Sequence, residues 1–199
     1  MEHINSWKNI GVFEKQLDLN LKELANQSTY PPHWGAFIFF IKKINPKTIL
    51  DIGCGCGSYY ELCKKEFKDI IYTGADYSKE AIELSIKKWD YTGFIQKDYL
   101  SLTKEFISDF DVIHLGGVLD VLPNGDEALE FILSLEAKNI IIGRIRLVNE
   151  PSHYKTYTAY DEITTYSYHH NIDNFFYMCN KYNYTVEMAD NNAYLKKVQ

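Results

Sequence analysis

The sequence predicts an α/β fold in which a mostly parallel β-sheet is covered by helices on both faces. Three observations carry this prediction. Short segments rich in β-branched residues alternate with helical patterns along most of the chain. These segments are apolar on both faces, as strands between two helix layers are. The length of 199 residues is enough for one domain with a substantial core.

The elements can be placed in order along the chain. The expected strands lie at 47–50, 70–75, 93–97, 111–116 and 139–145, and the helices between them near 57–67, 78–89, 99–107 and 124–136. Two helical segments come earlier, near 5–26 and 34–44. After a helix near 171–182, the segments "YTVEMA" and "AYLKKV" are close enough to pair as an antiparallel hairpin.

Composition excludes several functional classes. Acidic residues outnumber basic ones by 27 to 21, giving a net charge of -6 that disfavours a phosphate backbone as partner. The strongest apolar run, "AFIFFIKKI", is far shorter than the roughly 18 residues of a membrane span. The first residues lack the pattern of a signal peptide. We therefore expect a cytoplasmic protein with reduced cysteines, no nucleic-acid partner and no membrane span.

The stretch "ILDIGCGCG" at 49–57 joins the first strand to the next helix. Glycines at such a turn allow a sharp bend and bring backbone N–H groups close to a ligand. A dinucleotide loop would need its third glycine at position 58, where this chain has Ser58. The preceding carboxylate, Asp51, disfavours a pyrophosphate and favours a ligand that carries a cationic amine.

The two cysteines in this stretch admit a metal or redox role, or a packing role. Cys54 and Cys56 form a C-x-C pair with no histidine or second cysteine pair nearby at zinc-like spacing. Cysteine also serves as a small buried residue. The spacing therefore favours packing. No paired acids with a histidine are spaced for a magnesium site either, so we predict a metal-independent protein.

"LDIGCGCGS" resembles motif I of the class I S-adenosylmethionine-dependent methyltransferases, and "YTGADYS", "IQKDYL" and "FDVIHLGGVLDVLPN" resemble the later motifs of that family. The resemblance implies a Rossmann-like seven-stranded sheet with an antiparallel C-terminal strand and an N-terminal helical extension. It implies S-adenosylmethionine as cofactor, with S-adenosylhomocysteine as product. The implied cofactor-binding residues are Asp51, Gly53, Gly55 and Gly57 in the loop, Asp76 for the ribose, Tyr77, Asp98 and Tyr99 around the adenine, and Gly116 beside the methionine portion.

On this interpretation residues 1–199 form one methyltransferase domain. Its parts are an N-terminal helical cap (1–45), a cofactor-binding core (46–146), an acceptor-side insertion (147–170) and a C-terminal helix with hairpin (171–199). The insertion is rich in tyrosine and threonine, which suits a polyhydroxylated acceptor. A β excursion whose aromatic residues pack on the domain is the alternative interpretation of this segment.

The acceptor residues should lie at the carboxyl ends of the strands. We expect His169 or His170 to be the general base and Arg144 to orient the acceptor or a phosphate on it. An N-P-P-Y type motif after the fourth strand is absent, which disfavours nucleic-acid bases and protein glutamines. The predicted function is methyl transfer to a small molecule, a hydroxyl of a sugar or nucleotide-linked sugar. A small-molecule N-methyltransferase, a silent cofactor-binding subunit and a nicotinamide-dependent oxidoreductase are the alternatives.

Overall fold

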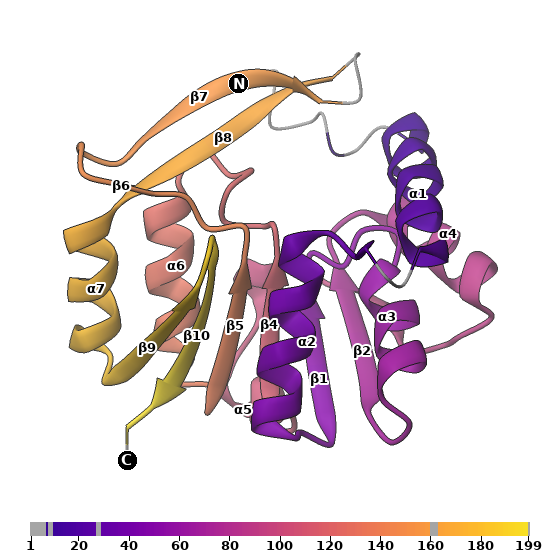
Figure 1. Ribbon diagram of the computed structural model, residues 1–199, viewed down its shortest axis with the longest axis horizontal. Coiled ribbons are helices and arrows are strands. Elements are labelled where there is room, and N and C mark those ends of the chain that lie inside the picture. The colour runs from indigo at the N-terminus through magenta and orange to yellow at the C-terminus, as the bar shows by residue number, and fades with distance from the viewer. Residues whose placement is uncertain (1–6, 8–9, 27–28, 160–162, 199) are drawn as a thin grey trace.

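A seven-stranded sheet forms the centre of the protein in the computed structural model, which describes all residues except 1–6, 8–9, 27–28, 160–162 and 199 (Figure 1). The strand order is β3-β2-β1-β4-β5-β10-β9. Strands β1 to β5 run parallel, whereas β10 runs antiparallel to both of its neighbours. The strands are β1 (Thr48–Ile52), β2 (Ile71–Asp76), β3 (Phe94–Gln96), β4 (Val112–Gly116), β5 (Asn139–Gly143), β9 (Tyr184–Ala189) and β10 (Asn192–Lys197).

Helices cover both faces of this sheet, as the sequence predicts. Because side chains alternate along a strand, Ile49 and Leu50 of β1 enter two different apolar clusters. One cluster packs α2 (Pro32–Ile44), α3 (Ser58–Glu66) and α4 (Lys79–Trp89) on one face. The other packs α5 (Lys104–Ile107), α6 (Gly125–Ser134) and α7 (Ile172–Lys181) on the opposite face. The predicted Rossmann-like fold is therefore confirmed.

The helix expected near 99–107 is instead two short pieces, a 3-10 turn at Tyr99–Ser101 and helix α5. Each piece has its own cap. The Asp98 carboxylate accepts a hydrogen bond from Leu100 N at 2.9 Å, and Thr103 Oγ1 accepts one from Phe106 N at 3.2 Å. Caps mark helix starts, so two of them five residues apart divide the segment.

The segment 147–170 forms a second sheet, with β6 (Leu147–Val148), β7 (His153–Ala159) and β8 (Ile163–Asn171) in the order β6-β8-β7. Strands β7 and β8 pair as an antiparallel hairpin that lies over the carboxyl ends of the central strands (Figure 1). Tyr166 and Tyr168 of β8 are buried. The segment is therefore a β excursion in which some aromatic residues pack on the domain, and its acceptor role remains a prediction.

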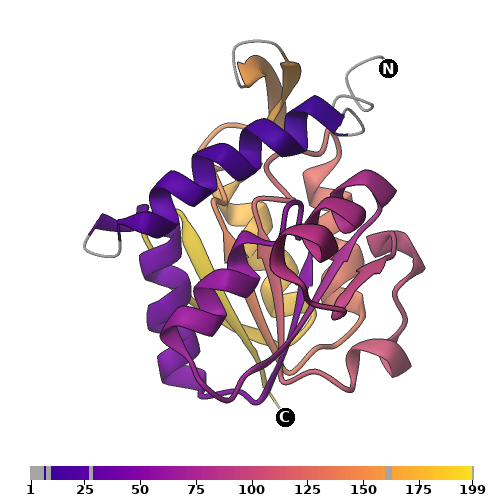
Figure 2. The same cartoon turned by 90° about the vertical axis from the view of Figure 1, so that its right-hand side faces the viewer.

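Helix α1 (Ile10–Ala25) crosses the same end of the molecule (Figure 2). It is tied to α3, because Lys65 Nζ donates to Leu24 O at 3.0 Å. Trp7 Nε1 donates to Thr165 Oγ1 at 2.9 Å and so links the N-terminal segment to β8. The helix predicted near 5–26 begins at Ile10, and most of its first five positions lie outside the described residues. No helix in the described part of the chain is both long and apolar enough to cross a membrane.

Candidate active site

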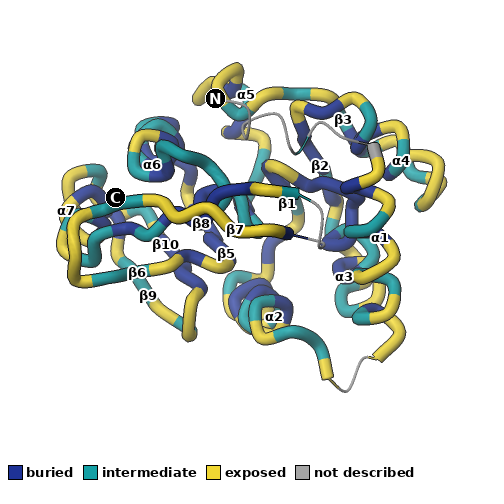
Figure 3. Tube along the Cα trace, turned by 90° about the horizontal axis from the view of Figure 1, so that it is seen from above, coloured by how far each residue is buried: buried dark blue, intermediate teal, exposed yellow. Residues whose placement is uncertain are grey.

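A cavity of about 780 Å³ opens at the carboxyl ends of β1, β2, β4 and β5. Figure 3 looks onto this end, with β7 and β8 over the middle of the molecule and α1 to one side. Phe13, Gln16 and Leu19 of α1 and residues 157–159 of β7 line the cavity, so it has walls from both covering segments. Of the predicted cofactor-binding residues, those that line it are Gly53, Gly55, Asp76, Tyr77, Asp98, Tyr99 and Gly116.

The glycine loop turns directly after β1 and is held by β2. Gly55 has φ +52 and its N–H donates to Asp76 Oδ2 at 2.9 Å. A Cβ on Gly55 would lie 2.6 Å from Gln16 Oε1, so a side chain there would displace the Gln16 amide from the cavity wall. The backbone of the loop therefore faces the cavity with no side chain in between.

Asp76 ends β2 as a buried carboxylate that two backbone groups hold in place. Its Oδ1 accepts from Ser78 N at 2.9 Å, while Oδ2 accepts from Gly55 N. Burial is the largest influence on its pKa, which it raises, and the hydrogen bonds from Ser78 and Gly55 lower it. The group is a fixed hydrogen-bond acceptor at the cavity wall.

Asp98 and two tyrosines complete this wall. Asp98 is exposed and caps the 3-10 turn, so its second oxygen remains available to the cavity. Tyr77 follows Asp76 at the rim. Burial, followed by the charges of Asp76 and Asp98, raises the pKa of Tyr77 to about 12, so its hydroxyl stays protonated at neutral pH.

Asp51 and Gly57, in contrast, do not line the cavity. The alternation of β1 turns Asp51 toward the α2–α3 face, where His114 Nδ1 lies 2.7 Å from Oδ1 and Tyr72 donates to Oδ2. A Cβ on Gly57 would lie 2.6 Å from Phe94 Cζ. Both residues support the loop from behind, and neither meets a ligand directly in this geometry.

Arg144 stands at the other end of the cavity, directly after β5. Its backbone has φ +62, and its N–H donates to Asn192 Oδ1 at 3.1 Å. Its Nη2 lies 3.4 Å from Asp120 Oδ2, and the side chain lines the cavity. The hydrogen-bonded, left-handed backbone aims the guanidinium at the site, in agreement with the place predicted for this residue.

Asp120 is a polar residue of this end that sequence reasoning missed. It is 3% exposed, and Oδ1 has no hydrogen-bond partner among the described residues. Burial raises its pKa, and the charges of Arg144 and Arg146 act against that effect. The available signal was an aspartate inside the apolar run "GGVLDVLP" that follows a strand.

Gln16 was also missed. Its Oε1 is buried at the cavity wall without a partner in the described part of the chain. A polar residue on an amphipathic helix gives no signal in the sequence that it faces a ligand.

The predicted histidines lie outside the cavity lining. His170 is fully buried, with Nδ1 2.6 Å from Asp126 Oδ1. His169 is partly buried, and its ring stacks on His153 with centroids 5.0 Å apart. No surface of His170 is exposed to an acceptor, which argues against a base role for it. A base role for His169 would require an acceptor that extends beyond the cavity, and it remains a prediction.

The four cysteines are buried free thiols. Burial raises the pKa of Cys54 and of Cys56, and Cys56 Sγ lies 3.3 Å from Ser58 Oγ. Within the described residues, no group of three or more His, Cys, Asp or Glu is placed to hold a metal ion.

The central sheet, its glycine loop and the cavity beside it define a class I methyltransferase fold. Residues 50–139 match the family profile described as a methyltransferase domain. Among curated protein sequences, nothing matches the chain.

Solved structures share the fold at low sequence identity. A methyltransferase from Clostridium acetobutylicum superposes with TM-score 0.65 and 11% identity, over 94% of this chain and 100% of that one. Human N-acetylserotonin methyltransferase in complex with SAM gives TM-score 0.59 and 13% identity, over 81% of this chain; the match spans 50% of the human protein. The sugar N-methyltransferase KedS8 from a Streptoalloteichus species gives 0.59 and 9% identity, over 88% and 91% of the two chains.

Residues 50–139 therefore match a methyltransferase domain, and the chain has the fold of the class I S-adenosylmethionine-dependent methyltransferases. The site fits this cofactor. A glycine cradle without side chains, the fixed Asp76 carboxylate and the unpartnered Gln16 Oε1 offer acceptors to the hydroxyls and amine of an adenosyl amino acid. Asp98 offers a further acceptor to an adenine amino group.

Proposed function

We propose that the protein transfers the methyl group of S-adenosylmethionine to a small-molecule acceptor, a hydroxyl of a sugar or sugar-like biosynthetic intermediate. The observation that carries this proposal is that Arg144 and Tyr157 line the cavity, with Asp120 Oδ2 3.4 Å from Arg144 Nη2. A volume of about 780 Å³ suits small molecules, whose sites span roughly 300–1,000 Å³.

The cofactor supplies an activated methyl group, so the protein chiefly has to hold an acceptor in line and exclude water. Helix α1 and β7 cover the cavity and reduce its exposure to solvent. Arg144 presents a planar fork of donors to acceptor oxygens. Asp120 is buried and does not line the cavity, but its Oδ2 lies 3.4 Å from Arg144 Nη2, so its carboxylate positions the guanidinium.

In the proposed organisation, residues 1–45 are a helical cap, 46–146 bind the cofactor, 147–170 serve the acceptor and 171–199 complete the sheet. The cofactor roles of Gly53, Gly55, Asp76, Tyr77, Asp98, Tyr99 and Gly116 belong to the same proposal, as does the acceptor role of Arg144. A cytoplasmic location remains a prediction.

The test is release of S-adenosylhomocysteine from the protein with a panel of nucleotide-linked sugars, sugar phosphates, small amines and phenols. Calorimetry first establishes S-adenosylmethionine binding and compares it with NAD. Methylation of a sugar hydroxyl, located by mass spectrometry and NMR, is the expected result. Turnover with an amine would establish N-methylation, which the fold shared with a sugar N-methyltransferase keeps as the second candidate. Cofactor binding without turnover across the panel would favour a silent subunit.

A further inference from the structure

A strip of cationic and imidazole side chains extends from Arg144, at the cavity, along the hairpin of β7 and β8. In β7 and β8, residues directly opposite each other share a face, and residues two apart along a strand do so as well. His153 pairs with His169, Lys155 with Ser167, and Tyr157 with Thr165, so one face of the hairpin carries the two imidazoles and the Lys155 ammonium. We define the cationic strip as Arg144, Arg146, His153, Lys155 and His169.

Tyr157 joins this strip to the cavity, because it lies on the same hairpin face and lines the cavity. Burial and the charge of Asp120 raise the pKa of Tyr157, whereas the charges of Arg144 and Arg146 and a hydrogen bond with Arg144 lower it. Arg144 lines the same cavity, and Arg146 lies beside β8, because its carbonyl oxygen accepts from His170 N at 2.8 Å. From Tyr157 to His153 the strand spans ~14 Å, at about 3.4 Å per residue.

Two imidazoles and Lys155 lie together at the far end of the strip. Burial lowers the pKa of His169, and His153, Lys155 and Arg146 lower it further, while Glu150 opposes them, so the His169 imidazole is neutral at pH 7. The rings of His153 and His169 lie at 29° to each other. In a chain of net charge -6, Arg146 and Lys155 are a local basic region. A bound anion would neutralise this region and would favour protonation of His169.

We propose that the cationic strip binds the diphosphate of an acceptor whose methyl-accepting end enters the cavity beside Arg144. The inference rests on the proposed function and narrows the acceptor to a nucleoside diphosphate derivative. The guanidinium of an arginine can donate two parallel hydrogen bonds to a phosphate group. The ammonium of Lys155 and a protonated imidazole add positive charge. The length of the strip suits a linker that runs out of the cavity toward solvent.

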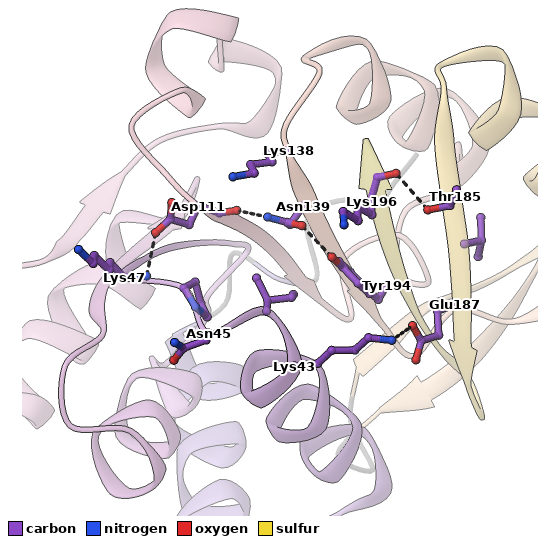
Figure 4. A pocket seen from close by; sticks show the side chains of 13 residues that line it. Lys43, Asn45, Lys47, Asp111, Lys138, Asn139, Thr185, Glu187, Tyr194 and Lys196 are labelled. Atoms are coloured by element: carbon purple, nitrogen blue, oxygen red, sulfur yellow. Dashed lines mark hydrogen bonds and ion pairs between the residues drawn. The ribbon is translucent and has the colours of Figure 1, made fainter. Parts of the chain in front are cut away.

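A second basic region offers a matched control. A groove of about 860 Å³ at the opposite end of the parallel strands is lined by residues that include Lys43, Lys47, Lys138 and Lys196 (Figure 4). Here Lys43 pairs with Glu187, and the Asp111 carboxylate accepts from the backbone of Lys47 at 2.8 Å. The groove lies at the amino ends of the strands, away from the cavity, so it tests for charge alone.

The experiment is calorimetric titration of inorganic pyrophosphate into the full chain saturated with S-adenosylhomocysteine. In the Arg146→Gln/Lys155→Gln variant we expect binding at least ten-fold weaker than in the native chain. The control Lys138→Gln/Lys196→Gln should bind within two-fold of native. Lowering the pH from 7.5 to 6 should strengthen native binding, and His169→Gln should remove most of that gain. UDP-glucose should bind more tightly than pyrophosphate.

The proposal would be overturned if pyrophosphate does not bind the native chain. It would also be overturned if binding is lost only in the Lys138→Gln/Lys196→Gln control. Tighter binding of pyrophosphate than of UDP-glucose would overturn the assignment of the strip to an acceptor. These titrations need no turnover, so a failed acceptor panel would count against the proposed function and leave the result for the strip standing.

Discussion

The two halves of the cavity are built in different ways. The proposed cofactor half is built around the glycine loop and the buried Asp76 carboxylate, supplied by turns that directly follow β1 and β2. The proposed acceptor half depends on side chains from distant segments: Arg144 follows β5 and Tyr157 comes from the hairpin, while Asp120, which precedes α6, lies behind Arg144. The difference teaches that the cofactor half is specified locally, whereas the acceptor half depends on which segments the fold brings together.

Removal of the Asp76 carboxylate should have the largest of the expected effects, a loss of affinity for the cofactor. Asp76→Ala leaves two backbone N–H groups of a buried turn unsatisfied, at a cost of about 1–3 kcal/mol each. We expect affinity for S-adenosylmethionine to fall about 100-fold in calorimetry. Asp69→Asn, an exposed position before β2, is the control and should bind normally. Unchanged affinity in Asp76→Ala would remove this residue from the site.

The acceptor half should respond to Asp120→Asn with a loss of turnover and no loss of stability. Burial raises the pKa of Asp120, so its stabilising form is the protonated one, present at acidic pH and lost as the pH rises through the folded-state value. At neutral pH the neutral isostere removes a buried charge but also the partner of the half-exposed Arg144, so the free energy of unfolding should change by less than about 1 kcal/mol.

Turnover in Asp120→Asn should fall roughly 10-fold with a raised KM for the acceptor, because Arg144 loses the carboxylate that positions its guanidinium. Cofactor affinity should remain within two-fold of native. A variant that loses stability and cofactor binding together would show that Asp120 has a structural role only.

Substitution of two glycines, one in the loop and one in α2, should change the stability of the protein in opposite directions. Gly57 has φ +76 and its Cβ position lies 2.6 Å from Phe94, so Gly57→Ala should cost about 2–4 kcal/mol from strain and overpacking. Gly35 lies inside α2 with nothing within 4 Å of its Cβ position, so Gly35→Ala should stabilise by about 0.5–1 kcal/mol. Chemical denaturation measures both, and effects of the same sign would refute this account.

The smallest effect is expected at the two loop cysteines. Their buried thiols have raised pKa values, so they should react slowly with a maleimide in the folded protein and rapidly in denaturant. Cys54→Ala/Cys56→Ala should retain cofactor affinity within a few-fold. A larger loss, accompanied by metal in the native protein, would support the metal interpretation.

Sequence patterning predicts most of this fold because its signals are short-range. Strands β1, β2, β4 and β5 appear as apolar runs, and the loop at 53–57 follows the first of them at once. The prediction of a single helix near 99–107 is wrong, because Thr103 caps a second helix inside a segment whose periodicity indicates one continuous helix. The strands of the segment 147–170 are difficult to predict from the sequence, because threonine and tyrosine are common both in loops and in exposed hairpins.

By itself, then, the sequence determined the sheet, the glycine loop and the acids that end its strands, since each depends on neighbours within a few residues. The tertiary structure alone decided that Asp51 turns away from the cavity to His114 and Tyr72. It also decided that Gln16 and Asp120 approach the cavity and that His170 does not line it. These outcomes depend on strand alternation and on contacts between segments far apart in the chain, which no local pattern encodes.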